Sequence, residues 1–176
     1  MILKLKNTPG IYLAGFMASG KTTIGRLLAE RLGWHFVDLD EEIEAAENIT
    51  IAQIFETRGE EEFRRLEHQM MRARVKAIER GSPTVIALGG GAFIQPKNYA
   101  LVENNGITIW LDCPLATVRR RVEKTYHRPL ARDLERLARL YEERREGYAR
   151  ADYRIPILSD DPAVAVEAVL GLPLFQ

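Results

Sequence analysis

The sequence predicts an α/β fold in which helices cover both faces of a parallel sheet. Two observations support this fold class: short apolar runs rich in β-branched residues alternate with longer runs of helical periodicity, and a glycine-containing loop joins the first pair. The expected architecture is a three-layer α/β/α domain with a five-stranded sheet. We expect its strands at residues 11–14, 35–38, 84–88, 107–111 and 153–157.

Three segments between these strands have the apolar spacing of helices. Residues 22–32 end at Gly33, a residue common just past a helix end, and lead directly into the second strand. Residues 51–80 are long for a simple crossover, so we expect two or three helices there, in an insertion that suits a substrate platform. Residues 132–150 predict an amphipathic helix with a charged outer face.

Length and charge restrict the kinds of partner. The 176 residues fit a single domain, residues 1–176, and the 25 Lys and Arg side chains are balanced by 25 Asp and Glu. The net charge is therefore zero, and the chain lacks the excess of positive charge that is typical of proteins that bind nucleic acid or an anionic membrane. The N-terminus lacks a signal-peptide pattern, and Cys113 is the only cysteine, so no intrachain disulfide can form. We expect a cytoplasmic monomer that binds neither nucleic acid nor membrane.

The most specific motif is residues 15–22, Gly-Phe-Met-Ala-Ser-Gly-Lys-Thr, which match G-x-x-x-x-G-K-S/T between an apolar strand and a helix. In such a loop, backbone N–H groups and a helix N-terminus face the phosphates of a nucleotide. Lys21 is expected to contact the β and γ phosphates, and Thr22 to bind Mg²⁺. This loop occurs in GTPases, ATPases, motor proteins and small-molecule kinases. The motif alone therefore does not identify the reaction. The expected ATP contacts of the loop are Gly15, Ala18, Ser19, Gly20, Lys21, Thr22 and Thr23.

Two acidic residues, Asp38 and Asp40, end the second expected strand. Because side chains two apart on a strand share a face, both should point into the crevice at the carboxyl ends of the strands. One would stand near Mg²⁺ and the other near the hydroxyl that receives the phosphoryl group. Two alternatives stay open: Asp40 as the cap of a helix that begins at Glu41, and Asp112, which ends the fourth strand, as the metal ligand.

Glycines and arginines mark the remaining candidate positions. Residues 89–91 are three glycines after the third strand, which either let a ligand approach the backbone or form a flexible turn. Arg64 in the helical insertion either holds a carboxylate or lies on the helix surface. Arg128 precedes a proline, in a segment that suits a mobile lid or a solvated basic face. The three histidines lack metal-ligand spacing.

Five motifs together resemble shikimate kinases: residues 15–22, 38–40 (Asp-Leu-Asp), 59–64 (Gly-Glu-Glu-Glu-Phe-Arg), 89–91 and 128–130 (Arg-Pro-Leu), in this order and at about the family's spacing. The resemblance covers nearly the whole chain. It implies a nucleoside-monophosphate-kinase-like sheet with strand order 2-3-1-4-5. It also implies ATP- and Mg²⁺-dependent phosphorylation of shikimate at the 3-hydroxyl, in aromatic amino-acid biosynthesis.

The resemblance also implies roles for regions and residues. A helical substrate-binding region would lie at about 39–66 and a lid at about 123–134. The implied catalytic residues are Lys21, Asp40 and Arg128, and the implied metal ligands are Thr22 and Asp38. Shikimate would contact Asp40, Arg64, Gly89, Gly90, Gly91 and Arg144, while Arg121 and Arg128 would join the phosphate loop in binding ATP.

The chain departs from the family pattern at four places. Ala18 stands where the family often has glycine, residues 128–144 form a shorter segment than usual, and Arg145 adjoins Arg144 as a competitor for its role. A further departure is the adenine loop, expected at about residues 159–162, which matches the family pattern poorly. Two rival functions therefore stay open. One is another small-molecule kinase, such as one acting on gluconate, and the other is a nucleotide-binding module without catalysis.

Overall fold

The protein is described by a computed structural model that covers residues 2–126 and 131–176. Its sheet has the parallel order β2-β3-β1-β4-β5, which confirms the predicted order. All strands lie within one or two residues of the predicted segments. Their bounds are Gly10–Ala14 (β1), His35–Asp38 (β2), Thr84–Ala87 (β3), Ile107–Asp112 (β4) and Tyr153–Pro156 (β5).

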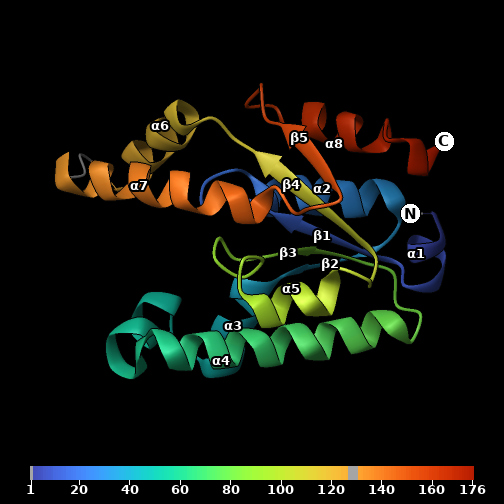
Figure 1. The fold of residues 1–176 in the computed structure, drawn as a ribbon, viewed down its shortest axis with the longest axis horizontal. Coiled ribbons are helices and arrows are strands. Elements are labelled where there is room, and N and C mark those ends of the chain that lie inside the picture. Colours follow the sequence, from blue (N-terminus) through green and yellow to red (C-terminus); the bar gives the residue numbers. More distant parts are fainter. Residues whose placement is uncertain (1, 127–130) are drawn as a thin grey trace.

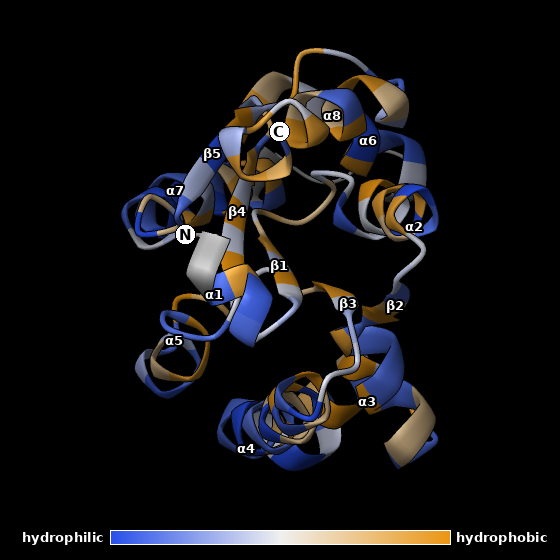
Figure 2. Cartoon of the chain, turned by 90° about the vertical axis from the view of Figure 1, so that its right-hand side faces the viewer, coloured by the Kyte–Doolittle hydropathy of each residue, from blue (hydrophilic) through white to orange (hydrophobic). Residues whose placement is uncertain are grey.

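Helices cover the sheet on both faces, as Figure 2 shows for α2 on one side and α5 on the other. The central strands β1, β3 and β4 are buried along their whole length, which explains their nearly continuous apolar sequences. The helices are α1 (Ile2–Asn7), α2 (Lys21–Leu32), α3 (Leu39–Glu47), α4 (Ile51–Glu79), α5 (Pro96–Val102), α6 (Leu115–Tyr126), α7 (Ala131–Tyr148) and α8 (Pro162–Leu170), followed by a 3₁₀ turn at Pro173–Phe175.

Local signals explain where these helices begin and end. Helix α2 stops at Gly33, whose φ of 67° is the left-handed conformation that suits glycine. Helix α4 begins with a capping box between Thr50 and Gln53. The same element is interrupted at Gly59, where φ is 85°, so the long segment consists of two helices joined at a kink, as expected.

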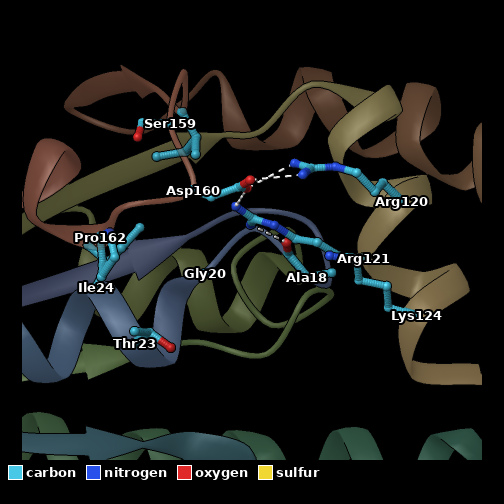
Figure 3. A pocket seen from close by; sticks show the side chains of 11 residues that line it. Ala18, Gly20, Thr23, Ile24, Arg120, Arg121, Lys124, Ser159, Asp160 and Pro162 are labelled. Atoms are coloured by element: carbon cyan, nitrogen blue, oxygen red, sulfur yellow. Dashed lines mark hydrogen bonds and ion pairs between the residues drawn. The ribbon is translucent and has the colours of Figure 1, made fainter.

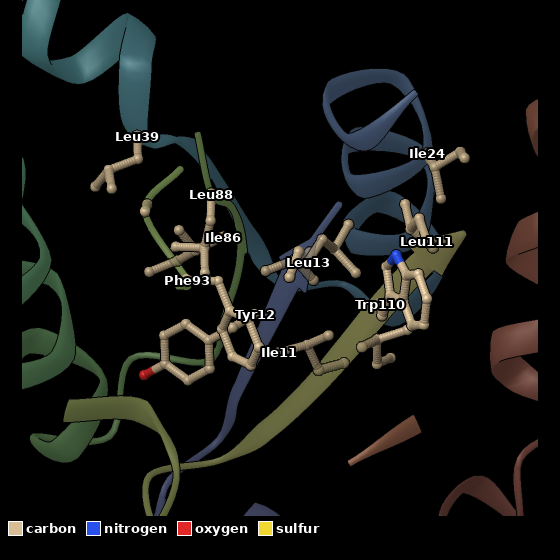
Figure 4. Packing of buried hydrophobic residues seen from close by; sticks show 14 of the residues in the cluster. Ile11, Tyr12, Leu13, Ile24, Leu39, Ile86, Leu88, Phe93, Trp110 and Leu111 are labelled. Atoms are coloured by element: carbon tan, nitrogen blue, oxygen red, sulfur yellow. The ribbon is translucent and has the colours of Figure 1, made fainter. Parts of the chain in front are cut away.

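The core lies on both faces of β1 (Figure 4). Ile11, Tyr12 and Leu13 are fully buried, and side chains from the neighbouring strands and from α2 pack around them. Each such aliphatic side chain contributes about 1.5–3 kcal/mol by leaving water. Cys113 is buried as a free thiol, as expected for a small packing residue. No helix in the described parts of the chain is long and apolar enough to cross a bilayer.

The carboxyl ends of β1 and β4 point toward the side of the molecule where α6 and α7 project, away from both chain termini (Figure 1). Since all five strands are parallel, the segments that follow them meet at this edge of the sheet. These segments include the loop at 15–20 after β1, Asp38 and Asp40 after β2, and the glycines at 89–91 after β3. The fold thus brings together motifs that are up to 76 positions apart, from 15 to 91.

Candidate active site

The loop after β1 has the backbone geometry of a phosphate-binding loop. Gly15 and Gly20 have φ values of 149° and 93°, and a Cβ at position 15 would lie 2.7 Å from the carbonyl oxygen of Leu111. Helix α2 starts directly after Gly20, which has no side chain to cap the helix, so the N–H groups of the first turn are available to an anion. Ala18 also has a positive φ, 59°, at a strain of about 1–2 kcal/mol, which accounts physically for glycine being common there.

Lys21 lies along this loop. Its Nζ donates to the carbonyl oxygens of Gly15 and Phe16, both at 2.8 Å. Burial lowers the pKa of Lys21 to about 8, against the opposing influence of the carboxylates Asp40 and Asp38. The ammonium group is therefore still charged at neutral pH and is held at the rim of the loop.

Asp38 and Asp40 meet in the crevice, although the reason differs from the prediction. Only Asp38 belongs to the strand; it caps α3 by accepting a hydrogen bond from Glu41 N at 3.1 Å, and Asp40 lies in the first helical turn. The interpretation of Asp40 as the cap was therefore wrong. Asp38 Oδ2 also accepts a hydrogen bond from the hydroxyl of Thr22, which ties the acidic pair to the phosphate loop.

Asp40 has the features of a reactive carboxylate. Its Oδ1 is buried and has no hydrogen-bond partner among the residues that the structure describes. Burial, followed by repulsion from Asp38, raises the pKa of Asp40, while Lys21 and Arg64 act in the opposite direction. A carboxylate with a raised pKa is a stronger proton acceptor, and an unpaired oxygen leaves room for a hydroxyl group.

Asp112, the alternative metal ligand, is already engaged. Its carboxylate is 6% exposed and accepts hydrogen bonds from Arg145 at 2.7 and 3.1 Å and from Arg154 Nε at 2.7 Å. These two guanidinium groups hold the pKa of Asp112 below its usual range despite its burial. The geometry favours Asp38 over Asp112 as the acid that faces the nucleotide.

The three glycines after β3 each leave space for one candidate side chain. A Cβ at Gly89 would lie 2.7 Å from Asp40 Oδ1, and one at Gly90 would lie 3.1 Å from Arg144 Nη1. A Cβ at Gly91 would collide with the guanidinium group of Arg64. The segment is therefore not an unspecific turn: its missing side chains allow one carboxylate and two guanidinium groups to converge beside the phosphate loop.

Arg64 is held by Glu67, a residue that the sequence interpretation missed. Arg64 Nη1 donates to Glu67 Oε1 at 2.9 Å, and the Glu67 side chain is 1% exposed. Burial raises the pKa of Glu67, against the influence of Arg64. Asn98 Nδ2 reaches the same oxygen at 3.4 Å. Glu67 could have been found in the sequence, because it is an acid in the buried stripe formed with Phe63 and Met71 at helical spacing.

The adjacent residues Arg144 and Arg145 point to different places. The Arg144 guanidinium group lies near Gly90 and 5.8 Å from the centre of the Phe16 ring. Arg145 instead pairs with Asp112 and stacks on Trp110, 4.9 Å from its ring centre. The geometry thus favours Arg144 as the arginine available to a ligand.

Two cavities meet at the phosphate loop. One, of about 340 Å³, is lined by the loop, by Asp38 and Asp40, and by Leu88, Gly89 and Gly90. The other, of about 470 Å³, lies between the loop, α6 and residues 157–162 (Figure 3). Ala18, Gly20 and Thr23 line both. A nucleotide in the larger cavity and an acceptor in the smaller one would place the terminal phosphate between them.

Arg121, which the resemblance places beside the nucleotide base, lines the larger cavity. Its Nη1 donates to the carbonyl oxygen of Ala18 at 2.8 Å, and its Nη2 donates to Asp160 at 3.0 Å. Arg128, predicted to be catalytic, lies outside the described residues.

Comparisons with known proteins identify the family to which the chain belongs. A model of the shikimate kinase family matches residues 17–170. A shikimate kinase from Persephonella marina is 44% identical over 165 residues, which cover 92% of this chain and 96% of that protein. The structure of shikimate kinase from Acinetobacter baumannii in complex with shikimate superposes with a TM-score of 0.84 at 32% identity, covering 97% of this chain and 95% of that one.

A second structure, shikimate kinase from Aquifex aeolicus, superposes with a TM-score of 0.79 at 36% identity and covers 92% of this chain and 94% of that one. The family model's range, 17–170, includes every lining residue of both cavities, and the two superpositions cover 97% and 92% of the chain. The chain belongs to the shikimate kinase family.

Proposed function

We propose that this chain transfers the γ-phosphoryl group of ATP to the 3-hydroxyl of shikimate, giving shikimate 3-phosphate and ADP. ATP-dependent phosphorylation of shikimate is the reaction of its family. The observation that carries the proposal for these residues is the triple glycine, which accommodates Asp40, Arg144 and Arg64 in one cluster beside the phosphate loop. One base and two cations suit an acceptor that has both a hydroxyl group to phosphorylate and a carboxylate to bind.

On the nucleotide side, the N–H groups of the loop and of the first turn of α2 bind the phosphates, and Lys21 turns from the Gly15 and Phe16 carbonyls toward the β and γ phosphates. Arg121 borders the base. Hydrogen-bond donors that already point at the γ-phosphoryl group stabilise its charge in the transition state, because they do not have to reorient during the reaction. Arg128 would add a further positive charge from the lid at about 123–134.

The residues beside Lys21 fit Mg²⁺. The hydroxyl of Thr22 and the carboxylate of Asp38 are neighbouring oxygen donors, the type that Mg²⁺ prefers, and they lie at the phosphate loop. We propose that these two residues hold the ion, directly or through its waters. When bound, Mg²⁺ neutralises charge on the β and γ phosphates.

On the acceptor side, Arg64 and Arg144 hold the shikimate carboxylate, and Asp40 accepts a hydrogen bond from the 3-hydroxyl. As the bond from that oxygen to the γ phosphorus forms, the bond to the β-phosphate oxygen breaks, and Asp40 takes up the hydroxyl proton. The unpaired Oδ1 and the raised pKa of Asp40 support this role. Burial of the site limits transfer to water.

The remaining parts of the proposal concern the whole molecule. We propose one domain over residues 1–176, a substrate-binding region at about 39–66 formed by α3 and the beginning of α4, and a monomer in the cytoplasm. The balanced charge and single cysteine support this setting, without nucleic acid or membrane as a partner.

A substrate panel with product identification tests the acceptor assignment. The purified chain with Mg·ATP should phosphorylate shikimate and leave gluconate unchanged, and ³¹P and ¹H NMR of the product should place the phosphate on the 3-oxygen. Phosphorylation of gluconate in preference to shikimate would support the rival small-molecule kinase. ATP binding without phosphorylation of either acid would support the non-catalytic module.

ATP affinity should decrease above pH 8. Below this pH, Lys21 is protonated in the free protein; above it, the group loses its proton, because burial lowers its pKa to about 8. Phosphate binding then requires proton uptake, so the Kd for ATP should rise up to about tenfold per pH unit. Calorimetry at pH 8.5 in buffers of different ionisation enthalpy should detect this uptake. In Lys21→Arg, whose side chain stays protonated, the Kd should not depend on pH between 7 and 9.5.

Substitution of the two competing acids should separate their roles. Asp38→Asn should raise the Mg²⁺ concentration for half-maximal activity by about tenfold or more, because a charged ligand is lost. Asp112→Asn should leave that concentration unchanged and lower the free energy of unfolding by about 1–2 kcal/mol, since Arg145 and Arg154, both partly exposed, lose their shared charged partner. Titration of activity with MgCl₂ and urea unfolding measure the two effects. A reversed pattern would assign the metal to Asp112.

A further inference from the structure

The larger of the two cavities, called the base-side cavity from here on, contains a charged cluster of which the proposed function uses only Arg121. Asp160, in the segment between β5 and α8, accepts hydrogen bonds from both nitrogens of the Arg120 fork, Nη1 at 2.8 Å and Nη2 at 2.9 Å. Its Oδ1 also accepts from Arg121 Nη2 at 3.0 Å. One carboxylate thus binds two successive arginines of α6, as Figure 3 shows.

Arg121 continues this chain of contacts to the phosphate loop. Its other nitrogen, Nη1, donates to the carbonyl oxygen of Ala18 at 2.8 Å. The same nitrogen would lie 3.8 Å from a Cβ at Gly20, so the guanidinium group extends over the loop. The residues 157–162, helix α6 and the phosphate loop are the three walls of the cavity, and Asp160 and Arg121 connect all of them.

Isolated ion pairs on a surface contribute little, because water screens them. This cluster differs in geometry, since one carboxylate receives three N–H groups and one of its partners binds through a planar fork. The two arginines lower the pKa of Asp160. Without the carboxylate, two adjacent guanidinium groups would repel each other, and Arg121 would keep its hydrogen bond to Ala18 O and a weaker contact with Cys113 Sγ at 3.9 Å, both through Nη1.

We propose that Asp160 is a positioning residue for ATP: it fixes Arg121 as a wall of the base-side cavity, which the apolar side chains of Ile24, Ile157 and Pro162 also line. A planar guanidinium group and apolar side chains that line the same cavity suit an aromatic ring. An arginine that is already held by two partners loses less conformational freedom when the ligand binds. The role rests on the proposed nucleotide site and does not depend on the acceptor.

Direct titration with Mg·ATP in the absence of shikimate tests this role, so failure of the acceptor assignment would not affect the result. Asp160→Asn should raise the Kd for ATP about tenfold, because a charge-assisted contact is lost. Asp160→Glu, which keeps the charge, should recover most of the affinity. The adjacent Asp161→Asn is the matched control and should leave the Kd unchanged, since Asp161 caps α8 through Ala163 N and does not line the cavity.

A double-mutant cycle shows whether Asp160 acts through Arg121. Arg121→Ala should weaken ATP binding, and adding Asp160→Asn to it should cause no further loss. In the kinetic assay, Asp160→Asn should raise the KM for ATP and leave kcat at saturating ATP and the KM for shikimate near wild type. The proposal would be overturned by an unchanged Kd in Asp160→Asn, by tighter binding, which would mean that Asp160 competes with ATP for Arg121, or by additive losses in the double variant.

Discussion

Asp40→Asn should lower kcat by about 10²–10⁴-fold, the usual contribution of a general base, while the Kd for ATP stays near wild type. The amide cannot accept the proton of the 3-hydroxyl group. The same variant should be more stable than the wild type. Because burial raises the pKa of Asp40, the ionised carboxylate destabilises the folded state at neutral pH, and a neutral side chain removes this cost. Single-turnover kinetics and thermal unfolding measure the two effects.

Glu41→Gln is the control for this substitution, because it makes the same chemical change at the next position of α3, on an exposed side chain. It should leave kcat unchanged. Near-normal turnover in Asp40→Asn would remove Asp40 from the chemistry. A large loss of both turnover and thermal stability would indicate that Asp40 maintains the fold instead.

Arg64→Ala should have the second large effect, on the acceptor. Removal of one partner of a buried charge pair costs about 2–5 kcal/mol of binding, so the KM for shikimate should rise about 10²-fold or more. The folded protein should also lose about 3 kcal/mol of stability, because Glu67 stays buried without its cation. Steady-state kinetics at varied shikimate concentration and urea unfolding provide the measurements.

Two further variants separate binding from stability. Arg65→Ala removes the next arginine of α4, whose side chain is 53% exposed and pairs with Glu62, and it should change neither quantity appreciably. In Arg64→Ala with Glu67→Gln, stability should recover while the KM for shikimate remains high. Recovery of the KM together with stability would show that Arg64 acts only on the fold.

Much of the fold could be predicted from the sequence, because the strong signals are local. Central strands buried on both faces must be continuously apolar, and the loop at 15–22 requires a strand before it and a helix after it. The acidic pair shows the limit of local reasoning. Strand alternation placed Asp38 and Asp40 in the crevice, but the strand ends at Asp38 and a helical turn brings Asp40 there. The position was right for a different reason.

Partners that are distant in sequence could not be predicted in the same way. The choice between Asp38 and Asp112 depends on Arg145 and Arg154, which reach Asp112 from α7 and β5. Periodicity describes one element at a time, whereas these contacts arise when elements pack together. The match between each glycine of 89–91 and its own side chain is likewise a property of the assembled fold.

Release of ADP from Mg·ATP, measured with and without shikimate, tests the central claim most directly, because a single assay reports nucleotide use, the acceptor and leakage to water. We expect strong release that depends on shikimate and only slow release in its absence, since water is not held in line with the γ phosphate as the bound hydroxyl group is. Release of ADP at the same rate with and without shikimate, or no release while ATP still binds, would contradict the proposed function.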